Sequence, residues 1–170
     1  MNGSQDGKYI LVVDDDPTMQ LVLQGMIEKA GFKPVIAENG EKAIQFFEIG
    51  GDNIGVVLVD RHMPDMDGFE VIKALNDSDQ HFGIPVIMQS GSKTPQDIRD
   101  AIDHGVFYYL TKPFALEALQ YALEFSIEKA KMRDAVRERV DHGFTPANMM
   151  LSSSFELRTM DEARSLAVLL

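Results

Sequence analysis

Five side chains that carry carboxylate, hydroxyl or ammonium groups follow short apolar segments of this chain. They are Asp14, Asp15, Asp60, Ser90 and Lys112. Carboxylates that are crowded together repel one another unless a cation lies among them, and hard oxygen ligands of this kind suit Mg²⁺. A hydroxyl and an ammonium group beside such a cation could bind a trianionic phosphoryl group. The residue types therefore indicate magnesium-dependent phosphoryl chemistry.

The apolar segments have the length and composition of buried strands. Four of the segments, at residues 9–13, 56–59, 85–88 and 106–110, precede the polar side chains. A weaker fifth segment lies at residues 33–37. Apolar runs bounded by polar turns are typical of parallel strands that helices cover on both faces. Ligands of such sheets bind beyond the carboxyl ends of the strands. The polar side chains are therefore expected to meet at one edge.

Helical patterns alternate with these segments. Four of the helices open on a capping residue, followed in two cases by Pro, at Asp16-Pro17, Asn39, Asp67-Gly68 and Thr94-Pro95. The helix after Thr94 carries Ile98, Ala101 and Ile102 in a helical pattern, and a fifth helix starts at about Phe114. Five strand-then-helix units predict an α/β fold with a doubly wound, five-stranded parallel sheet and helices on both faces.

Length and composition limit the class of protein. The chain has 170 residues, enough for one domain of ordinary size and an appendage. It has no cysteine, which excludes disulfides and thiolate metal sites and fits a reducing, cytoplasmic setting. No segment reaches the roughly 18 apolar residues that span a membrane. The net charge is −11 and no basic face is apparent, so nucleic-acid binding is not expected.

Four motifs together resemble the receiver domain of bacterial two-component response regulators. They are residues 10–17, 57–68, 85–91 and 109–114, and the resemblance covers roughly residues 7–127. It implies a flavodoxin-like fold and phosphoryl transfer from a phosphohistidine to an aspartate. The implied partners are a sensor histidine kinase or phosphotransfer protein and a downstream effector domain or protein.

The resemblance also implies which residues form the phosphorylation and metal site. Asp60 is similar to the phosphoacceptor. Asp15 resembles the direct Mg²⁺ ligand, and Asp14 resembles its neighbour that acts largely through water. Asp60 and the backbone carbonyl of His62 would complete the metal shell. The His62 side chain occupies a position that tunes the lifetime of the phosphoryl group in this family.

A second set of residues resembles the family's switch. Ser90 and Lys112 correspond to the groups that bind the phosphoryl oxygens, and Tyr109 to the aromatic residue that rotates inward with Ser90. Ser92 occupies a second tuning position, and the Lys112–Pro113 peptide bond is expected to be cis. The surface that responds would be formed by the helix at 94–104, the strand at 106–110 and the helix at 114–127.

Two residues depart from the family pattern without touching the phosphorylation set. Gly91 replaces a small residue such as Ala, which predicts a more mobile loop. Tyr108 replaces an Asp that is frequent beside the switch aromatic, and it adds apolar surface to the expected output face.

The ends of the chain carry separate expectations. Residues 1–7 are expected to be disordered, residues 8–127 to form the receiver, and residues 128–144 to form a helical linker. The uninterrupted helix at 114–142 could pair two copies of the chain. Residues 145–170 are interpreted as an appendage or as the truncated start of an effector domain, with a faint similarity to GHKL-type ATPase modules of anti-sigma regulators.

Two alternative functions stay open at this point. A phosphatase of the haloacid dehalogenase type also uses Asp, Lys and Mg²⁺, but its nucleophile follows the first strand as Asp-x-Asp, whereas Asp60 follows the third. A degenerate receiver would act only as a phosphorylation-independent interaction module. The expected activities of a receiver are limited to self-phosphorylation and autodephosphorylation, so it is not a conventional enzyme.

Overall fold

A computed structural model describes residues 8–49, 53–78 and 83–141, without the side chains of residues 139–141. The chain divides into two units, Met1–Arg133 and Asp134–Leu170. The expectations for residues 1–7 and 145–170 lie outside the described residues, as does the end of the expected linker. These expectations remain predictions.

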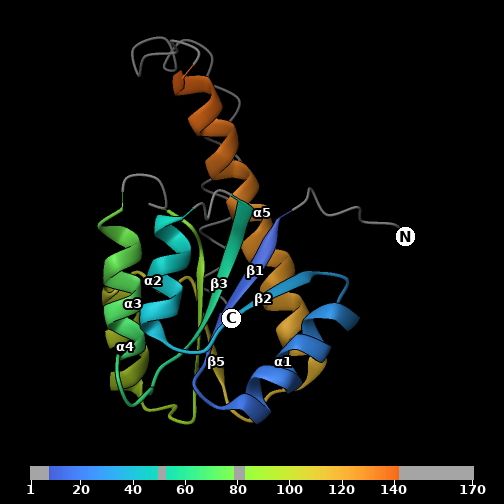
Figure 1. The fold of residues 1–170 in the computed structure, drawn as a ribbon, viewed down its shortest axis with the longest axis vertical. Helices are drawn as coiled ribbons and strands as arrows, with labels where there is room; N and C mark the ends of the chain where they lie inside the picture. Colours follow the sequence, from blue (N-terminus) through green and yellow to red (C-terminus); the bar gives the residue numbers. More distant parts are fainter. Residues whose placement is uncertain (1–7, 50–52, 79–82, 142–170) are drawn as a thin grey trace. The chain divides into compact units, whose positions relative to one another are not determined.

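The core of the first unit is a five-stranded parallel sheet (Figure 1). Its strands are β1 (Tyr9–Val13), β2 (Lys33–Ala37), β3 (Ile54–Asp60), β4 (Val86–Ser90) and β5 (Tyr108–Thr111). The strand order is β2-β1-β3-β4-β5, so β3 lies at the centre. Because all strands run in one direction, their carboxyl ends share one edge. The predicted doubly wound sheet is confirmed.

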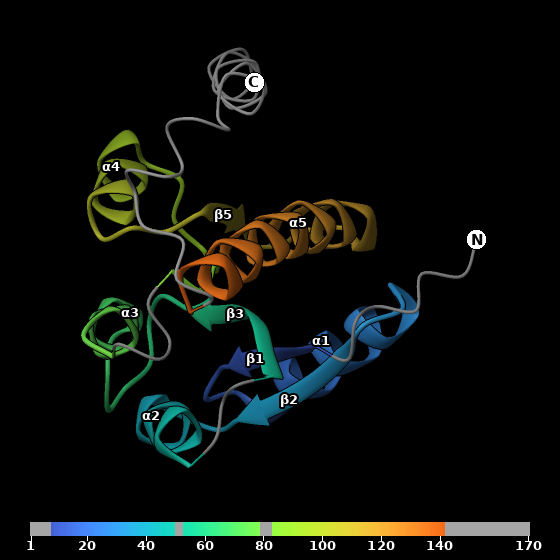
Figure 2. The same cartoon turned by 90° about the horizontal axis from the view of Figure 1, so that it is seen from above.

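Five helices cover the sheet on both faces. They are α1 (Pro17–Lys29), α2 (Gly40–Glu48), α3 (Gly68–Asn76), α4 (Pro95–Asp103) and α5 (Leu116–Asp141). Figure 2 shows α2, α3 and α4 on one side of the strands and α1 and α5 on the other. The expected caps are in place, because the side chains of Asp16, Asn39, Asp67 and Thr94 each accept a backbone N–H of the helix that follows.

Two apolar clusters, one on each face, hold these layers together. Alternate residues of a strand point to opposite faces, so Leu11 and Val13 enter the cluster under α2 and α3 while Ile10 and Val12 enter the cluster under α1 and α5. All four side chains are fully buried. Burial on both faces explains why the strands are uninterrupted apolar runs rather than alternating ones.

The structure differs from the expected pattern on α4 and β5. Of the three apolar residues expected on α4, only Ala101 is buried, while Ile98 and Ile102 are 37% and 65% exposed. The chain enters β5 at Tyr108, two residues later than the apolar run, because Val106 N–H still bonds the last turn of α4. Periodicity identified the helix correctly, but it did not show how little of the helix packs on the sheet.

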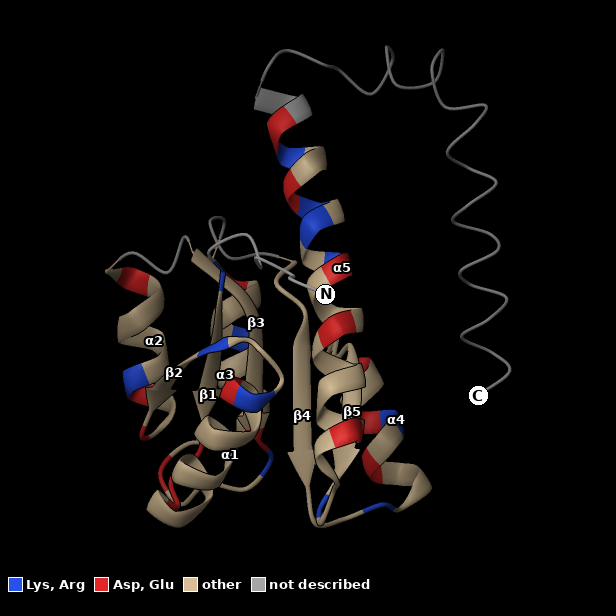
Figure 3. Cartoon of the chain, turned by 90° about the vertical axis from the view of Figure 1, so that its right-hand side faces the viewer, with Lys and Arg blue, Asp and Glu red and all other residues tan. Residues whose placement is uncertain are grey.

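Helix α5 is longer than the other helices, as expected from the absence of Pro and Gly. It buries Leu119, Leu123 and, further along, Ala130. Beyond Ala130, the helix contains both basic and acidic residues (Figure 3). Among the helices that the structure describes, none has both the length and the apolar composition to cross a membrane.

Two glycines beside the sheet edge should respond oppositely to alanine. A Cβ at Gly91 would meet nothing within 4 Å, whereas a Cβ at Gly68 would overlap the backbone carbonyl oxygen of Asp60. We expect Gly91→Ala to stabilise the fold by about 0.4–1 kcal/mol through the unfolded chain. Gly68→Ala should destabilise it by about 1–3 kcal/mol. Urea unfolding of both variants measures the two effects, and shifts of the same sign would contradict the prediction.

Candidate acidic site at the sheet edge

Three carboxylates lie together where β1 and β3 end. Asp14 and Asp15 follow β1 and Asp60 is the last residue of β3, and the register Val13↔Val59 places the two ends side by side. One ligand oxygen from each carboxylate lies within 4.8 Å of the others. Asp14 is buried, Asp60 is half-buried and Asp15 is exposed. The sheet topology therefore brings together carboxylates that are 45 or more positions apart in sequence.

Lys112 supplies one positive charge to this cluster. Its Nζ donates to Asp60 Oδ1 at 2.9 Å and lies 3.6 Å from Asp14 Oδ2. Its backbone N–H donates to Ser90 O at 2.8 Å, and the Lys112–Pro113 peptide bond is cis, as expected. One ammonium group cannot neutralise three carboxylates. The site therefore retains negative charge that favours a further cation.

Asp14 is the most buried member of the cluster, with 1% of its surface exposed. Burial raises the pKa of its carboxyl above the ordinary value of 3.8, and the nearby carboxylates of Asp60 and Asp15 add to this effect. The Asp16 N–H, which donates to Oδ1 at 2.9 Å, and the Lys112 charge act in the opposite direction. These donors therefore offset only part of the cost of burying the ionised form, and the net shift of the Asp14 pKa is upward.

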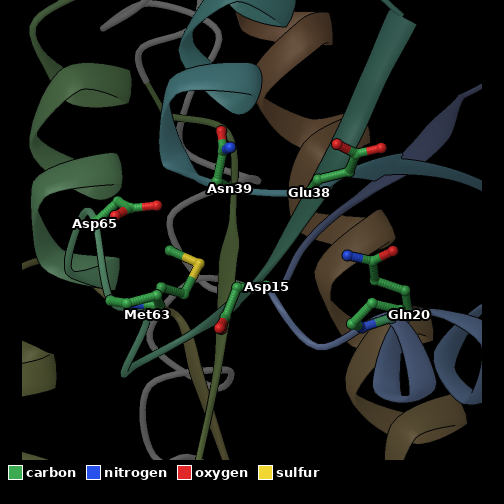
Figure 4. A pocket seen from close by; sticks show the side chains of 8 residues that line it. Asp15, Gln20, Glu38, Asn39, Met63 and Asp65 are labelled. Atoms are coloured by element: carbon green, nitrogen blue, oxygen red, sulfur yellow. The ribbon is translucent and has the colours of Figure 1, made fainter.

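The carboxylate set fits Mg²⁺. Opposite ligands of one Mg²⁺ ion are about 4 Å apart, which is close to the 4.8 Å spread of the three oxygens. Asp15 is exposed and lines a pocket of about 460 Å³ between α1 and the loops that follow β2 and β3. Figure 4 shows Asp15 among the residues around this pocket, whose lining residues are Asp15, Pro17, Gln20, Glu38, Asn39, Met63, Pro64 and Asp65. The acidic cluster is therefore open to solvent on the Asp15 side.

A hydrogen-bonded chain joins the expected switch residues. Ser90 is buried and its Oγ accepts the Ser92 N–H at 3.1 Å, while Tyr109 Oη–H donates to Ser92 O at 2.8 Å. Ser92 Oγ in turn donates to Asp97, which also accepts from Thr94 Oγ1. These two side-chain bonds lower the pKa of Asp97. Ser92, expected as a tuning residue, is thus the link between Ser90 and Tyr109.

His62 lies apart from these contacts. It is exposed in the loop after β3. The guanidinium of Arg61, the residue before His62, pairs with Asp67 and lies 3.9 Å from the ring centre of Phe69. The loop after Asp60 is therefore fixed through Arg61 and the α3 cap rather than through the His62 ring.

One residue of the site was missed from the sequence. Gln89 on β4 is fully buried, and its Nε2 donates to Asp14 Oδ2 at 2.7 Å. The signal was available, because Gln89 is an amide that lies between the apolar run at 85–88 and Ser90. A buried amide in a central strand needs a polar partner, and the carboxylates expected at the ends of the neighbouring strands are suitable partners.

Comparison with known proteins identifies relatives of this site. A sequence profile described as the response regulator receiver domain matches residues 10–124. The two-component response regulator ARR2 of Arabidopsis thaliana is 30% identical over 122 residues, which are 72% of this chain and 18% of that protein. The 3',5'-cyclic-nucleotide phosphodiesterase regA of Dictyostelium discoideum is 32% identical over 73% of this chain and 16% of that protein. The chain thus spans less than a fifth of the length of these relatives.

Solved structures share the fold and, in one case, hold the metal. The receiver domain of a sensor histidine kinase from Pseudomonas aeruginosa has a magnesium ion coordinated in its active-site cleft. It is 25% identical, with a TM-score of 0.65 over 72% of this chain and 98% of that chain. The acidic cluster of the present chain is of the type found at receiver Mg²⁺ sites.

Replacing Asp14 with Asn should stabilise the metal-free protein at neutral pH. The raised pKa of Asp14 means that the folded state loses stability as pH rises through that pKa. The side-chain amide introduced by Asp14→Asn would keep the Asp16 N–H bond, and the Gln89 amide can rotate to accept from the new NH₂. The advantage should be largest near pH 7 and should disappear below the ordinary pKa of 3.8.

Urea unfolding of the wild type and Asp14→Asn, in a metal chelator near pH 7 and near pH 4, measures this difference. The prediction would be contradicted if the difference in free energy of unfolding between the two proteins stayed constant or increased as pH falls.

Proposed function

Because the chain belongs to the response regulator receiver family, we propose that Asp60 accepts a phosphoryl group from a phosphohistidine of a sensor histidine kinase or phosphotransfer protein. The observation that carries this proposal is the 2.9 Å ion pair between Lys112 and Asp60 inside a cluster of three carboxylates. A lysine there can hold the acceptor ionised before transfer and can contact the phosphoryl oxygens after it.

The transfer step is a displacement at phosphorus. A carboxylate oxygen of Asp60 attacks, the new P–O bond forms, and the P–N bond breaks with its electron pair left on the imidazole nitrogen. Lys112 engages Oδ1 of Asp60, so Oδ2 is the oxygen left for attack. Later attack by water on the aspartyl phosphate returns the Asp60 carboxylate and inorganic phosphate. This is the autodephosphorylation expected of a receiver.

Mg²⁺ is the proposed cofactor. Asp14, Asp15, Asp60 and the backbone carbonyl of His62 would hold it, with Asp14 acting largely through water. When bound, the ion offsets the negative charge of the carboxylates and of the transferred group. Asp14 has its two oxygens already engaged by Asp16 N–H and the Gln89 amide, which supports an indirect role for it.

Phosphorylation is proposed to shift an existing equilibrium between two states of the domain. It replaces the single negative charge of the Asp60 carboxylate with a phosphoryl group that carries nearly two, beside Lys112 and Ser90. If Ser90 Oγ turns to a phosphoryl oxygen, it leaves the Ser92 N–H, and Tyr109 can then leave Ser92 O and rotate inward. The responding surface would consist of α4, β5 and the part of α5 up to residue 127. Its exposed apolar side chains, which suit contact with an effector or partner, are Ile98, Ile102, Tyr121 and Phe125.

The remaining expectations about the whole protein are proposals as well. The relatives come from plants, an amoeba and bacteria, so the bacterial source remains a prediction. The cytoplasmic setting, the helical linker, the pairing of two copies through residues 114–142 and the nature of the effector also remain predictions. No specific observation favours the haloacid dehalogenase-type phosphatase or the degenerate receiver.

Asp60 should be the only acceptor of phosphate. We expect Mg²⁺ and acetyl phosphate to add one phosphoryl group to the wild type and none to Asp60→Asn, because the amide is not a nucleophile. Intact-protein mass spectrometry reads the adduct directly. Asp65→Asn, a change to an exposed carboxylate on the wall of the nearby pocket, is the matched control and should still be phosphorylated. An adduct that persists in Asp60→Asn would refute the assignment.

Lys112→Ala should uncouple the switch more than it blocks phosphorylation. The carboxylates that hold the cation remain, so Asp60 can still be phosphorylated, but the ammonium that senses the phosphoryl group is lost. NMR of tyrosine-labelled protein, with and without beryllofluoride as a phosphoryl mimic, reports the environment of Tyr109. We expect a clear shift of the Tyr109 signal in the wild type and little or none in the variant. A full shift in Lys112→Ala would show that another group carries the signal.

A further inference from the structure

Gln89 belongs to the same lateral row of side chains as two of the carboxylates. The register pairs Val13 with Val59 and Asp60 with Gln89, so Asp14, Asp60 and Gln89 follow one another across β1, β3 and β4. Side chains at the same level of adjacent parallel strands point to the same face. The residues two positions earlier, Val12, Leu58 and Ile87, all lie in the cluster under α1 and α5, which confirms the shared face.

Two contacts and its place in the chain connect Gln89 with the ends of three strands. Its side-chain Nε2 donates to Asp14 Oδ2 at 2.7 Å, which reaches the end of β1. Its backbone carbonyl accepts the Arg61 N–H at 2.9 Å, directly after the phosphoacceptor candidate. Ser90, the next residue, carries the buried hydroxyl. Gln89 thus connects the groups that would bind the cation with those that would bind the phosphoryl group.

Packing alone does not explain a glutamine at this position. Its neighbours on β4, Ile87 and Met88, are fully buried apolar residues, and burying an amide costs free energy unless both of its polar atoms are bonded. Gln89 Oε1 has no partner among the residues that the structure describes. The assignment of the two amide atoms follows from the partner, since an ionised carboxylate only accepts and must face the NH₂ group. Burying this amide with an unbonded oxygen costs folding free energy, which indicates that Gln89 has a role at the site.

The amide limits what Asp14 can do. Asp14 Oδ2 lies between the Gln89 Nε2 at 2.7 Å and the Lys112 Nζ at 3.6 Å, while Oδ1 receives the Asp16 N–H. The carboxylate therefore has a fixed orientation before any cation arrives. If Gln89 were apolar, Asp14 would lose the donor on the β4 side, and Lys112 could be drawn from Asp60 towards Asp14.

We propose that Gln89 is a positioning residue of the cation site, which sets the affinity for Mg²⁺ by holding the Asp14 carboxylate in place. This inference rests on the proposed function, because it assigns the cation to the same acidic cluster. It adds a role for a residue that does not itself touch the cation. Outer partners that orient metal-binding carboxylates typically change metal affinity by about 10–100-fold when they are removed.

The test is a calorimetric titration with Mg²⁺ alone, without any phosphodonor. Gln89→Met keeps the length of the side chain and removes the donor, and we expect about tenfold weaker binding. Met88→Leu, a volume-conserving change in the adjacent residue on the opposite face of β4, is the matched control and should bind Mg²⁺ as the wild type does. Gln89→Asn keeps the amide but shortens its reach, and it should behave as Gln89→Met; it serves as the second variant should Gln89→Met not fold.

A second comparison tests whether Gln89 acts through Asp14. In the Asp14→Ala background, adding Gln89→Met should weaken Mg²⁺ binding no further, because the carboxylate that it positions is gone.

The outcomes separate this inference from the proposed function. Wild-type affinity in Gln89→Met or Gln89→Asn overturns the inference alone, as does an equal loss of affinity in Met88→Leu, which would reflect packing of β4. A further loss in the Asp14→Ala background also overturns it, because Gln89 would then act on another group. A wild-type protein that binds no Mg²⁺ in this titration overturns both the proposed cofactor and the inference.

Discussion

The repulsion among Asp14, Asp15 and Asp60 is the constraint on which the rest of the site depends. Their oxygens lie within 4.8 Å of one another, and only the Lys112 ammonium, among the residues that the structure describes, is close enough to offset them. A parallel sheet makes this arrangement possible, because it fixes the ends of β1, β3 and β5 at one edge through backbone hydrogen bonds that do not depend on the charges. The apolar clusters on both faces supply the stability that the acidic edge reduces. A cation or a positively charged partner that enters such a site stabilises it, because it reduces this repulsion. A phosphorylation site that depends on a metal ion requires this property.

A small number of contacts links the site to α4. Few bonds hold the loop after β4, and Ser92 takes part in most of them through its N–H, its hydroxyl and its carbonyl. A change at Ser90 therefore reaches Tyr109 and Asp97 through one residue. Helix α4 itself buries only Ala101, so little apolar contact opposes its movement. An element with few buried contacts is the kind of element that changes position at low cost.

Most of the fold could be predicted from the sequence because each level of pattern agreed with the next. Apolar runs indicated the strands, capping residues indicated the helix starts, and the position of Asp60 at the end of one run placed it beside Asp14 and Asp15 at the sheet edge. Side-chain contacts across the sheet were less accessible. The exposure of Ile98 and Ile102 depends on how α4 packs, which periodicity does not report. The pairing of Gln89 with Asp14 depends on the register of three strands, and no local pattern contains that register.

The departure at Tyr108 gains a physical meaning beside the proposed switch. Tyr108 contacts Tyr121 edge to face at 6.4 Å, Tyr121 stacks near Phe125 at 6.3 Å, and Phe125 stacks on Phe107 at 5.2 Å. Lys129 closes the row, with its ammonium 4.2 Å from the Phe107 ring. Together with Lys129, these rings join the start of β5 to three successive turns of α5, and Tyr121 and Phe125 are about half exposed. Tyr109, the switch residue of the proposed function, is the next residue in the chain after Tyr108. Because aromatic contacts depend on ring geometry as well as buried area, a displacement of β5 would change the exposed face of α5 without any rearrangement of the core beneath it.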